Sequence, residues 1–395
     1  MASRSLIRSL GVVLALASAV AAGGGCARAG HGAPASAEAP NATTRALHAL
    51  FASEWDHDMR EHPVWASELG DMRFADRWDD VSLAAQARRD AHDKEVLSKL
   101  AAIRRADLSR EDALSYDLFR HRYEEAVEGQ SFGLHLFPIN QRGGIQTADE
   151  VADALPFTTR KHFEDWNARL ASFPRYMDQT IELLTEGART GMTHPKVVMQ
   201  RVLGQIDKQI VSDPTTSPFF GPYQKAAAST AASSVSPAER ERLASEAKRL
   251  IASSVVPAFQ KLRTFWTETY LPACKDDVGA WQLPNGRALY AYLVRSYTTT
   301  KLTPDEVHAI GLREVARIRG EMEAVKAKIG FKGSLKELFE HLRTDPGFYF
   351  ESGAELLAAY RDLAKRIDPL LVNVFGKLPR TPYGVASIPE HVAPD

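Results

Sequence analysis

The chain has 395 residues, of which 44% are apolar and 25% are charged, so it can bury a large core in one or two domains. Its 49 basic and 50 acidic residues nearly cancel, and no basic run stands out. This balance excludes the electrostatic footprint of a nucleic-acid-binding protein, and it gives no attraction to an anionic membrane surface. The two cysteines, Cys26 and Cys274, are too few for a disulfide framework and lack metal-ligand spacing, and Cys274 is predicted to be a lone thiol near a loop.

The first residues have the layout of an export signal. Arg4 and Arg8 precede an apolar run from Leu10 to Ala22, and glycines follow it. The run is too short to cross a bilayer stably, which is typical of a secretory signal. Cys26 comes directly afterwards and resembles the lipidated cysteine of a bacterial lipoprotein signal, although Gly23 departs from the aliphatic residue usual three positions earlier.

Two mature forms are therefore expected. If Cys26 is lipidated, residues 1–26 are the signal, and the protein is anchored to a membrane facing the periplasm and touches it only through the lipid. If cleavage falls near Ala19 to Ala22 instead, the protein is soluble in the periplasm or secreted. Residues 27–44 are mostly Ala, Gly, Pro and Ser and are predicted to form a flexible tether, so the folded domain is expected over residues 45–395.

The rest of the chain carries repeated helix-start chemistry. A serine or threonine followed three residues later by an acidic residue can cap a helix N-terminus. Such pairs start at Ser109, Thr147, Ser236, Thr303, Ser334 and Ser352. No long alternation of β-branched residues appears, so the sequence predicts an all-α fold: a large multi-helix domain with few or no short strands. Two lobes are possible, divided by the Pro-rich stretch 213–222.

The predicted elements follow in chain order. The first helix carries Leu47, Leu50 and Trp55 at helical spacing and ends at Pro63. Further helices are expected over about 82–105, 109–128, 147–187, 194–212, from 236 with a kink at Pro257, from 303 to about 329, from 334, and from 352 to about 376. The stretch 132–146 contains Pro138 and two adjacent glycines, which predict an extended or looped excursion, and residues 281–286 form another loop.

The helix expected at Thr303 is the most completely specified element. Thr303 and Glu306 form a capping box, and Pro304 supplies a fixed φ at the first helical position. An apolar stripe then recurs at steps of three and four, and it consists of His308, Gly311, Val315, Ile318, Met322, Val325 and Ile329. This pattern predicts a buried face with one partner helix along it.

A search for reactive constellations finds little, and no catalytic or metal-binding residues are predicted. The sequence has no His-Glu-x-x-His, no Gly-x-Ser-x-Gly and no phosphate loop. His57, Glu61 and His62 approach an inverted zinc motif, but the spacing is one residue too long and Pro63 ends the helix there.

The strongest candidates for a binding surface are polar residues in the excursion and one histidine. Asn140, Gln141 and Gln146 lie among glycines and could line a groove, or could belong to an ordinary buried crossover. His308 lies on the apolar stripe, where it is either a neutral buried imidazole or a group in a cleft.

Six stretches in a fixed order carry distinctive patterns. They are Pro63-Val-Trp-Ala-Ser-Glu-Leu-Gly-Asp71 with Asp79-Asp-Val-Ser82; Phe137-Pro-Ile-Asn-Gln141 with Gly144-Ile-Gln146; Arg169-Leu with Glu182-Leu-Leu-Thr-Glu-Gly187; Leu283-Pro-Asn-Gly286 with Tyr290; Thr298 to His308 with Gly311 and Glu314-Val-Ala-Arg317; and Phe375-Gly-Lys-Leu-Pro-Arg380. Together they resemble the bacterial exported family described as "domain of unknown function 885". The resemblance covers nearly all of the chain after the tether.

This resemblance implies a helical protein whose active centre is a His-Glu segment followed closely by Gly-His-His, a zinc-peptidase-like motif. By the family pattern, that motif lies downstream of the segment matching Phe375 to Pro394, and the 395-residue sequence does not contain it. No zinc ligand is therefore carried over, and zinc is expected only in a full-length relative. The chain resembles the N-terminal two thirds of the family domain and is expected to be a truncated, inactive member that meets a peptide substrate. The alternative is a non-catalytic peptide- or protein-binding lipoprotein, and the oligomeric state stays open.

Overall fold

The computed structural model describes residues 41–228 and 234–387, so Cys26, the signal and the tether up to residue 40 lie outside the described part. The described residues form two compact units, a first unit that ends at residue 301 and a second unit that begins at residue 302. The predicted division at 213–222 is wrong, because this stretch belongs to the first unit. Its short turns place Phe219 fully inside the core of that unit.

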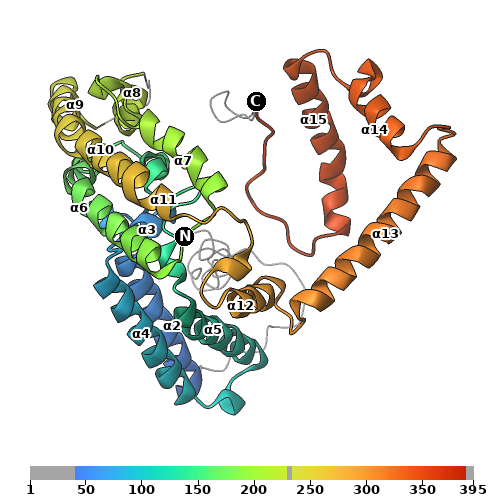
Figure 1. Cartoon of the computed structure of the whole chain (residues 1–395), viewed down its shortest axis with the longest axis horizontal. Helices are drawn as coiled ribbons and strands as arrows, with labels where there is room; N and C mark the ends of the chain where they lie inside the picture. The colour runs from blue at the N-terminus through green and yellow to red at the C-terminus, as the bar shows by residue number, and fades with distance from the viewer. Residues whose placement is uncertain (1–40, 229–233, 388–395) are drawn as a thin grey trace, which may run out of the picture. The chain divides into compact units, whose positions relative to one another are not determined.

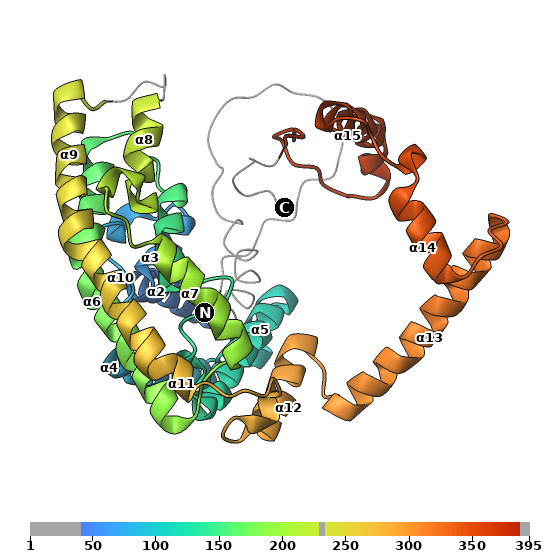
Figure 2. The ribbon, with the colours of Figure 1, turned by 45° about the horizontal axis from the view of Figure 1, so that its top comes forward.

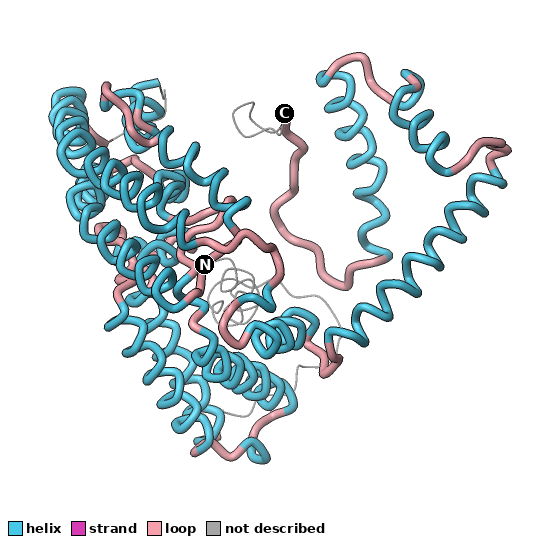
Figure 3. Tube along the Cα trace, in the orientation of Figure 1, coloured by secondary structure: helices cyan, strands magenta, loops and turns pink. Residues whose placement is uncertain are grey.

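The all-α prediction is confirmed (Figure 3). Within the described ranges no strand forms, and the bridges Asn140–Gly143 and Pro195–Lys275 are isolated. Five of the six predicted N-caps are present, since the side-chain oxygen accepts from the amide three residues later at Ser109, Ser236, Thr303, Ser334 and Ser352. At Thr303 and Ser334 the reciprocal bond from the glutamate completes the capping box.

The first unit contains the helices α2 to α12 (Figure 1). Their bounds are α2 Ala42–Glu61, α3 Pro63–Glu68, α4 Leu83–Ala101, α5 Arg110–Gly129, α6 Arg160–Thr190, α7 Lys196–Lys208, α8 Gly221–Ala228, α9 Pro237–Leu250, α10 Val256–Phe265, α11 Leu271–Ala273 and α12 Gly286–Thr298. α2 begins at Ala42 because the Asn41 side chain accepts from the Thr44 amide, so residues 42–44 of the predicted tether already belong to this helix.

Two predictions about local structure fail for physical reasons. Thr147 does not cap a long helix, because residues Ile145–Ala154 form a 3-10 helix with a non-helical backbone at Thr147 itself. The long helix α6 begins later, where Thr159 and His162 form the capping box. α12 was not predicted, since its start at Asn285 has a left-handed backbone and no side-chain cap.

α2, α4 and α5 form a three-helix bundle at one end of the first unit. α4 runs antiparallel to α2, and Leu47 and Leu100 of the two helices belong to one buried cluster. Polar contacts also cross the bundle: the buried Glu54 lies 2.6 Å from the His92 ring, and Arg122 pairs with Asp58 at 2.8 Å. The first contact fixes α4 against α2 and the second fixes α5 against α2, so the residues that follow α5 have a defined starting point.

The second part of the unit is built on two long parallel helices (Figure 2). α6 lies along the nearly continuous helix from α9 to α11, with Asn167 donating to the Leu243 carbonyl near one end and Lys261 pairing with Asp178 further along. The π-helical turns Ile251–Val255 and Trp266–Tyr270 lie just before Pro257 and Pro272. The kink predicted at Pro257 is thus a widened π-helical turn. The helix continues through this turn although Pro257 has no amide hydrogen to donate.

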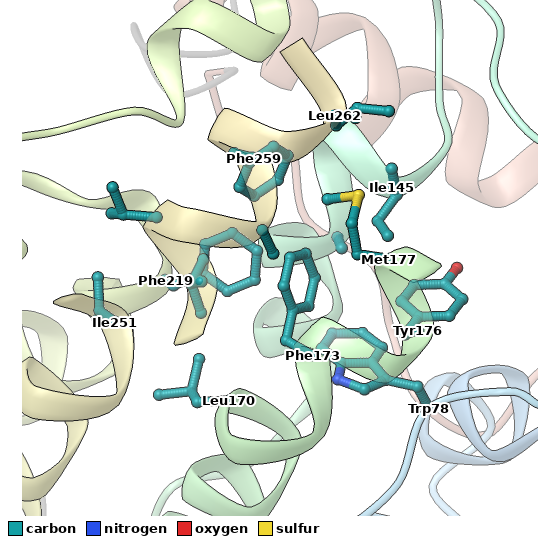
Figure 4. Packing of buried hydrophobic residues seen from close by; sticks show 14 of the residues in the cluster. Trp78, Ile145, Leu170, Phe173, Tyr176, Met177, Phe219, Ile251, Phe259 and Leu262 are labelled. Carbon is teal, nitrogen blue, oxygen red and sulfur yellow. The ribbon is translucent and has the colours of Figure 1, made fainter. Parts of the chain in front are cut away.

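Aromatic side chains fill the space between these helices (Figure 4). Phe173 of α6 has ring neighbours on three sides, with centroid distances of 5.7 Å to Trp78, 5.2 Å to Phe219 and 5.4 Å to Phe259. These contacts join residues that are distant in the sequence. The core therefore holds the segment around residue 78, the 218–220 turn and α10 against the same face of α6.

A fully buried arginine ties the first motif stretch to α6. Arg169 is 0% exposed, and its guanidinium donates to the Arg77 carbonyl at 3.0 Å and the Ser67 hydroxyl at 2.9 Å. Burial lowers the pKa of Arg169 to about 10, while the nearby Asp79 carboxylate favours its charged form. Because Trp78 also donates to the Arg169 carbonyl at 2.8 Å, these residues form one polar centre inside the core.

The second unit consists of α13 (Pro304–Lys328), α14 (Leu335–Thr344) and α15 (Gly353–Ile367), followed by a 3-10 helix at Asp368–Asn373. The prediction that the α13 stripe is buried is wrong, because α13 has no buried residue, and Val315 and Ile329 are 65% and 61% exposed. His308 is exposed as well. Helical spacing decides which side chains share a face, but burial requires a partner, and in the described part of this unit only Leu335 and Leu338 are buried.

Exposed apolar side chains on the second unit should bind a hydrophobic dye. We expect the purified chain to enhance 8-anilinonaphthalene-1-sulfonate fluorescence, and the double substitution Val315→Ser with Val325→Ser to reduce it. Because both side chains are exposed, the double variant should unfold within about 0.5 kcal/mol of the wild type per substitution. Ala324→Ser on the same helix is the control. A dye-silent, monodisperse chain would contradict this expectation.

Candidate functional site

A cavity of about 320 Å³ opens in the first unit, and three segments that are distant in the sequence line it. Leu134, Phe137 and Asn140 come from the excursion after α5, and Thr193, His194 and Pro195 come from the link between α6 and α7. The third segment runs from Lys275 into α12 and contributes Asp277, Val278, Gln282, Leu283, Leu289, Leu293 and Tyr297. The lining is mainly aliphatic and aromatic, with a few polar groups, as in small-ligand sites of proteins.

Close backbone contacts hold the first two walls together. A side chain at Gly187 of α6 would lie 2.8 Å from the Met192 carbonyl and 3.2 Å from the Leu136 carbonyl, so only glycine lets both segments approach. Below them, Leu136, Leu183 and Met192 form a small buried cluster. The excursion and the 192–195 link are therefore packed on the same end of α6.

The third wall is held by a tight turn before α12. The Gly286 amide donates to the Leu283 carbonyl at 2.8 Å, and a Cβ at Gly286 would lie 2.0 Å from the Ala280 carbonyl oxygen. α12 is anchored at its other side, since the Tyr292 hydroxyl donates to the Glu125 carbonyl at 3.0 Å. A parallel bridge joins Pro195 to Lys275 and links this wall to the second one.

Gly286→Ala should therefore damage the site as well as the fold. The added methyl cannot be accommodated without moving the 280–286 backbone, so we expect a loss of roughly 2 kcal/mol in the free energy of unfolding. Urea denaturation measures this loss. Gly353→Ala, where a Cβ has no neighbour within 4 Å, is the matched control and should leave the stability nearly unchanged. Equal stability of the two variants would show that the turn is not tight.

The wall around residue 193 holds polar atoms without protein partners. The Thr193 hydroxyl and the His194 Nε2 atom are buried and make no hydrogen bond, and the same holds for the Gln282 Nε2 atom of the third segment. Such groups cost roughly 1–3 kcal/mol each when they are left unsatisfied. Buried polar groups are nearly always paired in folded proteins, so three such atoms around one cavity mark it as more than ordinary core.

His194 is neutral at neutral pH. Burial lowers the pKa of its imidazole to about 4, and the ring packs against Phe137 with centroids 4.7 Å apart. The neighbouring Cys274 is also an uncharged group, because burial raises the pKa of its thiol to about 11. The lone thiol predicted near a loop is thus buried and kept in its unreactive protonated form.

Among the residues that line the cavity, two of the third segment carry a charge. Lys275 and Asp277 both line the cavity, and the Lys275 ammonium has no carboxylate partner among the described residues. By contrast, Lys196 pairs with Asp276 at 3.0 Å. Asn140 lines the wall formed by the excursion after α5. Its Oδ1 atom accepts from the Arg142 amide at 2.8 Å, and among the described residues its Nδ2 atom has no acceptor.

The predicted groove residues lie at different places. Asn140 lines the cavity, whereas the neighbouring Gln141 is exposed and its carbonyl accepts from Gln205 at 3.0 Å. Gln146 is buried behind the loop and donates to the Asn140 carbonyl at 2.7 Å, so it supports the turn that presents Asn140. His308 belongs to the second unit.

Sequence reasoning did not find the remaining lining residues. Thr193, His194 and Lys275 lie in links between helices, where periodicity carries no information. The available signal was Gly191, followed after Met192 by Thr-His-Pro, since glycine ends a helix and His-Pro fixes an extended link.

The described residues offer no zinc site. Within 41–228 and 234–387, no group of three or more His, Cys, Asp and Glu side chains could hold a metal ion. In the near-motif at the end of α2, the residues have separate contacts: His57 stacks on His92 at 3.7 Å, Glu61 pairs with Arg89 at 3.4 Å, and His62 lies 3.5 Å from Asp79. In the part of the chain that the structure describes, we also find no helix with the length and apolarity needed to span a membrane.

Comparison with known proteins places the chain in a family. The model of the family described as "Bacterial protein of unknown function (DUF885)" matches residues 63–395. The chain is similar in fold to the crystal structure of "the putative lipoprotein from Colwellia psychrerythraea", with a TM-score of 0.79 at 20% identity. That match covers 89% of this chain and 64% of the solved chain, so this chain spans less than two thirds of its length. Among curated proteins, none matches. Since the family model covers most of the sequence, this protein belongs to the DUF885 family of bacterial proteins.

Proposed function

We propose that this chain is an exported protein that binds peptides in the cavity of its first unit and does not cleave them by itself. The observation that carries the proposal is the cavity of about 320 Å³, with an apolar lining and a few polar groups at its walls. A water molecule occupies about 30 Å³ in the liquid, so the cavity has room for roughly ten waters or for one large side chain with its backbone. The excursion 132–146 forms one wall through Leu134, Phe137 and Asn140, as a groove-lining loop would.

The absence of cleavage is supported by the sequence. A zinc peptidase needs ligands such as histidine and glutamate at fixed spacing, and the 395 residues contain neither His-Glu nor Gly-His-His. His194 lines the cavity as a neutral imidazole, whereas the protonated Cys274 thiol is not among the lining residues, so the two are not arranged there as a nucleophile and a base. Hydrolysis of the zinc-peptidase-like kind would thus need metal ligands that these 395 residues do not supply in that motif.

Export and anchoring belong to the same proposal. The signal-like residues 1–26 support export, and the solved protein of similar fold is itself described as a "putative lipoprotein". Mass spectrometry of the mature N-terminus in the native host distinguishes the two forms. A diacylglyceryl adduct on Cys26 supports the anchored form, and a free N-terminus near Ala19 to Ala22 supports the soluble one.

Peptide binding can be tested on the intact chain with a mixed peptide pool. After incubation and size-exclusion chromatography, mass spectrometry identifies the peptides that elute with the protein and any new fragments in the whole pool. We expect a subset of peptides to co-elute with unchanged masses. Co-elution of no peptide would refute binding, and new fragments that disappear with a metal chelator would refute the statement about cleavage.

A further inference from the structure

We propose that the cavity is a side-chain pocket: it takes one large apolar side chain of a peptide and holds the oxygen of the adjoining carbonyl or carboxyl group with Asn140 and Lys275. This inference rests on the proposed peptide binding and names the residue class that the site prefers. We therefore expect the cavity to bind leucine-like or aromatic side chains and to exclude charged ones.

The apolar part of the pocket comes from all three walls. Leu134 and Phe137 face it from the excursion, and Leu283, Leu289 and Leu293 line it from the turn and α12. A Leu or Phe side chain that leaves water gains roughly 1.5–3 kcal/mol, which is about tenfold or more in affinity. A basic side chain would meet the like charge of Lys275, and an acidic side chain would lose its hydration among the apolar walls, so both should be excluded.

The polar part has an excess of donors. Asn140 and Lys275 line the cavity, and neither the Asn140 Nδ2 atom nor the Lys275 ammonium has a hydrogen-bond partner within the described ranges. Both can only donate, so the complementary ligand atom is an acceptor oxygen. Asp277 also lines the cavity, but its Oδ1 atom accepts from the Val278 amide at 2.7 Å and it is exposed. Water therefore screens its charge more than that of the half-buried Lys275.

The wall formed by Thr193, His194 and Pro195 supports the same assignment. His194 is uncharged, so it adds no positive charge that would require an anion deep in the pocket. The Thr193 hydroxyl and the His194 Nε2 atom are buried without partners, and a small rearrangement on binding would let a ligand amide satisfy them. A pocket that served only as packing would more usually have an inner wall of carbon atoms.

Blocked amino acids test the pocket without the complications of long peptides. We would titrate the intact chain with N-acetyl-leucinamide, N-acetyl-leucine, N-acetyl-glycinamide and N-acetyl-aspartamide, and follow the ligand signals by NMR. Both leucine probes should bind, and the glycine and aspartate probes should bind at least about tenfold more weakly. If N-acetyl-leucine binds more tightly than its amide, the favoured source of the oxygen is a peptide carboxyl terminus. The reverse order assigns it to an internal carbonyl.

Variants locate the binding. Leu293→Trp should fill the pocket and weaken leucine binding at least about tenfold, whereas Tyr290→Trp on the exposed side of the same helix should not. Lys275→Met should weaken N-acetyl-leucine more than the amide, with Lys208→Met as the control. Circular dichroism of each variant confirms folding.

Two outcomes separate this inference from the proposed function. If the leucine and glycine probes bind equally, or if Leu293→Trp binds as the wild type does, the pocket assignment is wrong even if peptides from the pool co-elute. If the probes bind with the expected order while no peptide from the pool co-elutes, the pocket stands and the peptide-binding function fails.

Discussion

Arg169→Met should cost about 3–5 kcal/mol of the free energy of unfolding, which is among the largest effects expected for any single substitution in this protein. The methionine fills a similar volume but leaves two buried groups worse off. The Arg77 carbonyl loses its donor, and Asp79, which is 5% exposed, loses the favourable effect of a nearby cation. Arg169→Lys should recover only part of the loss, because an ammonium cannot reach the Arg77 carbonyl and the Ser67 hydroxyl with a planar fork.

The control for this experiment lies on the same helix. Arg175 pairs with Asp80 at 3.7 Å, but its side chain is 76% exposed, so Arg175→Met should cost less than about 1 kcal/mol. Urea denaturation of the three variants under identical conditions gives the comparison. If Arg169→Met unfolds within 1 kcal/mol of the wild type, the buried centre is not a determinant of the fold.

The second large effect is a loss of stability in weak acid that depends on His194. Its pKa is about 4 in the folded protein against an ordinary value of 6.5, because burial disfavours the imidazolium. Between these two values the unfolded chain binds more protons than the folded chain, so stability rises with pH across this window. The contribution is complete above pH 6.5 and is lost as the pH falls towards 4, by about 3 kcal/mol in total.

His194→Gln should remove this contribution while keeping a polar side chain. Its absolute stability can differ, because the contact with Phe137 is lost, so the relevant quantity is the change between pH 7 and pH 4.5. Other groups titrate in the same way in both proteins and cancel in the comparison. The wild type should lose more stability than the variant over this interval, and parallel stability curves would show that His194 is not buried as a neutral group.

The sequence predicts those parts of the fold that depend on neighbouring residues. Thr303 with Glu306 and Ser334 with Glu337 form their capping boxes, because both members of each pair lie within one helical turn. Thr147 does not cap a long helix, although Glu150 follows it at the spacing of a capping box. The Asn140–Gly143 turn and the Gly144 backbone instead direct residues 145–154 into a 3-10 helix.

Features that depend on distant residues could not be read in this way. The periodicity of α13 is correct, but it does not say what covers the stripe, and its residues are exposed. Arg169 looks like an ordinary charged residue of an amphipathic helix until the segment around Trp78 folds over it. The cavity joins three segments from residue 134 to residue 297, so only Asn140 of its lining was among the candidates.

Photo-crosslinking tests the central claim, which is that peptides bind in the cavity of the first unit. A peptide from the co-eluting subset, with photo-leucine in place of its leucine, would be irradiated with the intact chain and mapped by mass spectrometry. The account predicts crosslinks to Leu134, Leu283 and Leu293, and their loss in Leu293→Trp. Crosslinks confined to the exposed apolar side chains of α13 and α15 would contradict it.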